Sequence, residues 1–153
     1  MRRILALGFL FLPLLACATA RVSGLDRAMR DDLQEARQMV QTGHYRQAID
    51  DLSMVLELNP RSEEARLIRA VAYQALEQFP EAIQDYETVI KQNPKSSKSY
   101  YNLGMIYAFK MNEPKMALTH FDRFLSLEPQ HARSIQVARI MCSIDSTGAD
   151  SGL

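Results

Sequence analysis

The residues that could carry out metal or thiol chemistry are few and lie far apart along the chain. His44, His120 and His131 are the three histidines, and their spacing does not bring together the three or four ligands that a zinc site requires. Cys142 follows His131 by eleven residues, about three turns away on a shared helix. That separation does not allow the histidine to activate the thiol as a nucleophile. The sequence therefore predicts no metal ion and no cysteine-based catalysis.

The remaining polar residues favour helix ends and helix surfaces. Serines gather at positions 96, 97 and 99, where hydroxyl groups are suited to start a helix. The glycine loops that hold phosphates, the paired histidines of zinc proteases and the C-x-x-C motif are all missing from the sequence. We therefore expect no enzyme, no cofactor and no small-molecule substrate. The carboxylates are expected on exposed helix faces or in first turns, where they complement the helix dipole: Asp50, Asp51, Glu63, Glu64, Glu81 and Asp85.

The composition is that of a soluble globular protein with room for one domain. Hydrophobic residues make up 47% of the 153 residues and charged residues 24%. Lys and Arg together number 18, as do Asp and Glu, so the chain lacks the basic excess expected of a nucleic-acid-binding protein. We expect no nucleic-acid partner.

The first twenty residues have the layout of a secretory signal. Arg2 and Arg3 precede an apolar stretch, residues 4–15, and small residues follow at 16–20. The apolar stretch is short for a membrane span, and Pro13 would bend a helix near its end.

Leu14-Leu15-Ala16-Cys17 resembles the lipobox of bacterial lipoproteins. The resemblance implies a signal peptide of residues 1–16, acylation of Cys17 with chains such as palmitate, and a lipidated tether of residues 17–25. Ala18 does not resemble the Asp that retains such lipoproteins in the inner membrane, so an outer-membrane site facing the periplasm is expected. With Cys17 acylated, Cys142 is expected to be an unpaired core residue.

Two other outcomes remain open for this segment. Ala18-Thr19-Ala20 also fits an ordinary signal-peptidase site, which would release a soluble secreted protein. The apolar stretch could also stay uncleaved as an anchor.

A period of 34 residues runs through the rest of the chain. Pro60 and Pro94 are 34 residues apart, and Pro129 follows 35 residues later, with one extra residue between Phe109 and Lys115. The third unit resembles the tetratricopeptide repeat (TPR) most closely, with both halves of that pattern present: Tyr100, Leu103, Gly104, Tyr107, Ala117, Phe121 and Pro129.

The TPR resemblance implies an all-α, right-handed superhelical solenoid of helix–turn–helix hairpins with a C-terminal capping helix. The three repeats are expected at residues 26–62, 63–96 and 97–130, and the capping helix at 131–144 with Ile135, Ala138 and Cys142 on one side. Residues 145–153 are expected to be a disordered tail.

Some positions depart from the repeat pattern. Arg66 and Arg69 replace large apolar residues in the second unit, and Asp32 and Glu35 do so in the first. Polar residues suit the outer face of a terminal repeat, which has no neighbour. Separately, the spacing of residues 23 and 26 suggests a capping box for the first helix.

In TPR proteins the first helices of the hairpins line a concave groove that holds a protein or peptide. Transferred position by position, the resemblance predicts an apolar groove with a basic rim. Two alternatives are that the capping helix fills the groove, or that these residues only pack between hairpins. The predicted groove residues are Arg30, Leu33, Arg37, Leu67, Val71, Lys98, Tyr101, Asn102, Met105 and Phe109.

Together these features predict a scaffold lipoprotein of the bacterial cell envelope. Its partner is expected to be an envelope protein or peptide, in the assembly of a pilus, a secretion system or the outer membrane. A periplasmic adaptor that recruits a cell-wall enzyme is the second possibility.

Overall fold

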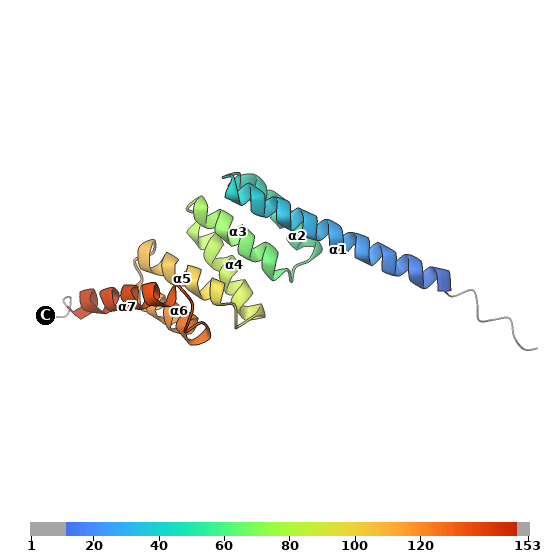
Figure 1. Ribbon diagram of the computed structural model, residues 1–153. Coiled ribbons are helices and arrows are strands. Elements are labelled where there is room, and N and C mark those ends of the chain that lie inside the picture. Colours follow the sequence, from blue (N-terminus) through green and yellow to red (C-terminus); the bar gives the residue numbers. More distant parts are fainter. Residues whose placement is uncertain (1–11, 150–153) are drawn as a thin grey trace, which may run out of the picture.

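The chain folds into consecutive helices that stack into an elongated array (Figure 1). The computed structural model describes residues 12–149, with side chains from residue 27 to residue 144. Within residues 12–149 there is no strand, and α1 packs on α2, α3 on α4, α5 on α6 and α6 on α7. The predicted all-α hairpin solenoid is confirmed. The helices are α1 (Leu12–Gln41), α2 (Tyr45–Leu58), α3 (Glu63–Ala75), α4 (Phe79–Gln92), α5 (Ser97–Phe109), α6 (Pro114–Leu127) and α7 (Ser134–Ala149).

The second helix of each hairpin ends in the same way. Asn59, Asn93 and Glu128 are the C-terminal caps of α2, α4 and α6, and each donates its backbone N–H to a carbonyl four residues earlier. Each cap precedes a proline, which disfavours the helical region for the residue before it. The next helix then starts at a capping position, as at Ser62, whose Oγ accepts the N–H of Ala65 at 3.2 Å.

The three hairpin turns share one backbone feature. Gly43, Glu77 and Asn112 stand at equivalent turn positions and have φ angles of 84°, 60° and 53°. The extra residue of the third unit lies in this turn, since four residues separate α5 from α6 and three separate α3 from α4. Only Gly43 adopts this left-handed conformation without steric cost.

The core divides into two clusters along the array. One lies among α1, α2 and α3 and includes Leu33 and Leu52; the larger one runs from α3 to α7 and includes Tyr86 and Phe121. Gly104 permits the close approach of α5 and α6, because a Cβ there would overlap the ring of Phe121.

The start of α1 differs from the prediction. The helix begins at Leu12, so Ser23 and Asp26 lie inside it and the expected capping box is wrong. Pro13 is tolerated because it falls in the first turn, where its missing N–H has no helical partner. Residues 12–25, which include parts of the predicted signal and tether, extend α1 beyond the hairpins (Figure 1). Residues 1–11 of the predicted signal lie outside the described residues.

The capping helix also differs from the prediction. It packs through Val137, Ile140, Met141 and Ile144, whereas Cys142 is exposed, so the prediction of a core cysteine is wrong. Those four larger side chains bury more apolar surface than the predicted face could. The helix continues through residues 145–149, because no proline stops it and each further residue adds a backbone hydrogen bond. Residues 150–153 of the predicted tail lie outside the described residues.

Candidate functional site

An open hollow lies across the first helices of the three hairpins. It has a volume of about 550 Å³ and takes residues from α1, α3 and α5. A second hollow of about 350 Å³ adjoins it through Arg37 and Glu64, which line both. We call the two together the groove. Its lining residues are Arg30, Leu33, Gln34, Arg37, Val40, Gln41, Glu63, Glu64, Leu67, Ile68, Val71 and Lys98.

The groove has an apolar floor on α3. Leu67 and Val71 are one helical turn apart and lie on one side of the helix, and Val71 is 40% exposed. Ile68 joins them although it was not among the predicted groove residues. Its repeat position is that of Asn102, 34 residues later, so the period could have identified it.

Charged side chains of both signs surround this floor. Arg37 of α1 donates from Nη2 to Oε1 of Glu64 on α3, which links two neighbouring hairpins across the groove. Glu63 is held by Asn93, whose Nδ2 donates to Oε2 at 2.9 Å. Lys98 takes part in none of the ion pairs between described side chains. Its ammonium group is therefore available to an anionic group on a ligand.

Four of the ten predicted groove residues lie further along α5 and do not line the groove: Tyr101, Asn102, Met105 and Phe109. The structure brings the other six together in the groove: Arg30, Leu33, Arg37, Leu67, Val71 and Lys98. The ring of Tyr101 is 5.4 Å from that of Phe124, and the guanidinium of Arg133 lies 4.7 Å from the centre of the Tyr101 ring. Arg133, in the segment that leads into α7, therefore packs on Tyr101. The remaining three differ in exposure: Asn102 and Met105 are half-buried, and Phe109 is 58% exposed.

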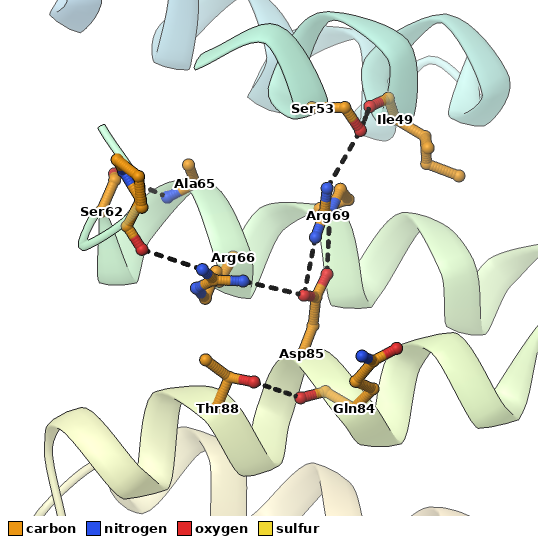
Figure 2. A network of polar contacts seen from close by, with 10 residues as sticks. Ile49, Ser53, Ser62, Ala65, Arg66, Arg69, Gln84, Asp85 and Thr88 are labelled. Atoms are coloured by element: carbon orange, nitrogen blue, oxygen red, sulfur yellow. Dashed lines mark hydrogen bonds and ion pairs between the residues drawn. The ribbon is translucent and has the colours of Figure 1, made fainter. Parts of the chain in front are cut away.

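A polar network lies apart from the groove, where α2, α3 and α4 meet (Figure 2). Asp85 of α4 is only 3% exposed, so the prediction of an exposed carboxylate is wrong. Arg69 donates to it twice, from Nε and Nη2, at 2.8 Å each, and Arg66 donates to it at 3.4 Å. Arg69 Nη1 also donates to Ser53 Oγ of α2 at 3.0 Å. The two arginines that depart from the repeat pattern thus neutralise one buried carboxylate.

His120 is partly buried between aromatic side chains. Its ring stacks on that of Tyr107, 5.4 Å away and 3° from parallel, and the centre of the Tyr100 ring lies 6.1 Å from it. Neither ring nitrogen has a hydrogen-bond partner. Burial lowers the pKa of His120, and Glu87 opposes this more weakly.

The described residues offer no grouping of metal ligands. No three His, Cys, Asp or Glu side chains converge among them. In the same part of the chain, no helix is both long and apolar enough to cross a membrane.

Family comparisons identify the repeats in the second half of the chain. Residues 72–109 match the family described as TPR repeat, and residues 97–131 match the tetratricopeptide repeat. A stretch of 49 residues is 45% identical to sperm-associated antigen 1 of Mus musculus. That match covers 32% of this chain, which spans only 5% of the curated relative it matches.

Several solved structures share the fold. The first TPR of Spaghetti (RPAP3), bound to an HSP90 peptide, has a TM-score of 0.71 at 22% identity, covering 79% of this chain and 93% of that one. The Yersinia enterocolitica type III secretion chaperone SycD, in complex with a peptide of the translocator YopD, has a TM-score of 0.75 at 16% identity, covering 80% and 95%. PilW, a type IV pilus biogenesis factor, has a TM-score of 0.68 at 22% identity, covering 82% of this chain and 56% of PilW.

Proposed function

We propose that this chain, which contains tetratricopeptide repeats in the matching superhelical fold, is a scaffold that binds a segment of a partner protein in its groove. The observation that carries the proposal is the open hollow of about 550 Å³ across three successive hairpins. Two proteins of similar fold, the RPAP3 domain and SycD, were solved with peptides bound. A TPR groove of this kind therefore suits a peptide or an amphipathic helix.

The groove's chemistry indicates which segment it suits. Leu67, Ile68 and Val71 offer an apolar floor to two or three apolar side chains on one face of a helix. Lys98 suits a carboxylate beside that face. Arg37 and Glu64 pair with each other and are about half exposed, so they can exchange partners at little cost. We expect an amphipathic, mildly acidic segment.

Substitutions on the floor and at Lys98 beside it test the binding site. Leu67→Glu introduces a charge where the partner's apolar face would lie, and Lys98→Glu reverses the charge of the free ammonium group. We expect Leu67→Glu to abolish binding and Lys98→Glu to weaken it, with helicity unchanged by circular dichroism. Equal binding by the wild type and both variants would show that the partner binds outside the groove.

We further propose that the scaffold is an envelope lipoprotein, tethered through Cys17 and facing the periplasm from the outer membrane. The motif Leu14-Leu15-Ala16-Cys17 at the end of an apolar stretch supports this. Each buried methylene of an acyl chain contributes about 0.8 kcal/mol, so two or three chains would form a lasting anchor. The partner is then an envelope protein, in assembly of a pilus, a secretion system or the outer membrane. PilW, a pilus biogenesis factor, shares the fold but is longer than this chain.

The identity of the first residue of the mature chain tests the proposed lipid tether. Mass spectrometry of the membrane fraction should find an acylated Cys17 as the first residue. A Cys17→Ser variant should leave that fraction. An unmodified chain that begins at Arg21 would refute the lipid anchor and leave the groove proposal untouched.

A further inference from the structure

The outer side of the first hairpin carries exposed apolar side chains next to carboxylates. Met54 and Leu58 of α2 are 59% and 77% exposed. They line a hollow of about 270 Å³ between α1 and α2, together with Val55 and three acidic residues. We call this surface the N-terminal end face; it is formed by Asp32, Glu35, Asp51, Met54, Val55 and Leu58.

The repeat period shows what the same surface looks like inside the array. Thirty-four residues after Asp32, Glu35 and Asp51 stand Arg66, Arg69 and Asp85. In that second unit the two arginines neutralise Asp85, and Arg69 reaches α2 of the preceding hairpin through Ser53. This side of a hairpin therefore faces the unit before it.

In the first unit, the negative charge at these positions is not neutralised by arginines. All three of its side chains at these positions are carboxylates, and none takes part in an ion pair between described residues. Met54 and Leu58 also stand where the second unit has the polar Thr88 and Gln92. Apolar side chains with neighbouring uncompensated carboxylates indicate a docking surface for an apolar and cationic helix face.

The other end of the array offers such a helix face. Ile135, Ala138, Arg139 and Cys142 are exposed on α7 at the i, i+3, i+4, i+7 spacing of one helix side, and Ile135 is 68% exposed. Residues 133–144 contain two arginines and no carboxylate. We call this the outer stripe of α7.

We propose that the outer stripe of α7 in one copy packs on the N-terminal end face of a second copy, so that the chains join head to tail. Arg139 supplies the positive charge that the carboxylates of the end face lack, and Ile135 packs against Met54 and Leu58. The contact uses a different surface on each copy. A pair therefore keeps one free N-terminal end face and one free outer stripe of α7, to which further copies can add. The proposal involves no groove residue and does not depend on groove binding.

Disulfide trapping in cells that express the whole chain tests the contact. Met54→Cys places a thiol on the end face opposite the native Cys142 of another copy. After mild oxidation with copper phenanthroline, we expect a ladder of covalent multimers on a non-reducing gel. The ladder should disappear on reduction and in the Met54→Cys, Cys142→Ser double variant. Met116→Cys, at an exposed methionine of α6, is the matched control and should give no ladder.

A charge reversal tests the pairing itself. Arg139→Glu in the Met54→Cys background should reduce the ladder at least tenfold, and adding Asp51→Arg should restore most of it. Dimers alone, a ladder that survives Cys142→Ser, or a ladder insensitive to both charge changes would each overturn the proposal. Trapping of a different protein by Met54→Cys in place of a second copy would also overturn it.

Discussion

Arg69 and Asp85 form a bidentate ion pair between α3 and α4, with both nitrogen–oxygen distances at 2.8 Å (Figure 2). The hydrogen bond to Asp85 raises the pKa of Arg69, against the opposing effect of burial. Because the carboxylate is buried, the pair contributes to stability chiefly by avoiding an uncompensated charge.

We predict that Arg69→Met lowers the free energy of unfolding by about 3 kcal/mol, since Asp85 would stay buried with only the longer contact to Arg66. Adding Asp85→Leu should recover most of the loss. Urea denaturation with an unchanged m value would measure both. If the double variant is as unstable as Arg69→Met, the buried charge is not the cause.

We predict that Glu77→Gly stabilises the protein by about 0.5 kcal/mol. Glu77 has a φ of 60°, and this left-handed conformation is sterically strained for a residue with a Cβ but not for glycine. Gly43→Ala, at the equivalent turn position with a φ of 84°, should destabilise it by about 1 kcal/mol. Thermal unfolding should shift in opposite directions for the two variants. A shift in the same direction would show that the backbone conformation does not control these turns.

We predict that Gly104→Ala destabilises the protein by about 1–3 kcal/mol, because the new methyl group would overlap the ring of Phe121. Phe121→Leu in the same chain should lessen the penalty of Gly104→Ala. A double-mutant cycle measures this coupling, and strictly additive losses would contradict the proposed overlap.

We predict a stability change at mildly acidic pH that depends on His120. The pKa of His120 is lowered in the folded protein. As the pH falls, His120 is therefore protonated in the unfolded chain before it is protonated in the folded protein. The contribution of neutral His120 to the stability of the fold is complete above its pKa in the unfolded chain, about 6.5. This contribution is lost as the pH falls from there through the pKa of His120 in the folded protein. His120→Phe should remove this loss, and NMR titration of the wild-type ring should give a midpoint below 6.5. A midpoint at or above 6.5 would contradict the burial argument.

The sequence predicts the fold well because its strongest signals are local. The asparagine–proline pairs at 59–60 and 93–94 end helices through steric effects that act between neighbours, and the 34-residue period places the hairpins. The floor of the groove follows from the groove positions that the TPR resemblance implies, as Leu67 and Val71 show.

Other features depend on contacts between distant segments. Asp85 is buried only because two arginines of the preceding helix reach it, and the period alone does not reveal that pairing. Likewise, α7 has two apolar sides, and only its packing against the last hairpin selects Val137 over Cys142 as the buried residue.

The most direct test of the central claim is site-specific photocrosslinking in the groove. A benzoylphenylalanine at Val71 reports on the groove floor, and one at Met116 on α6 is the matched control, because both native side chains are 40% exposed. In living cells, Val71 should give one defined adduct with a partner protein, which Leu67→Glu abolishes, and Met116 should give none. No adduct at Val71, or the same adduct from both positions, would contradict a partner-binding groove.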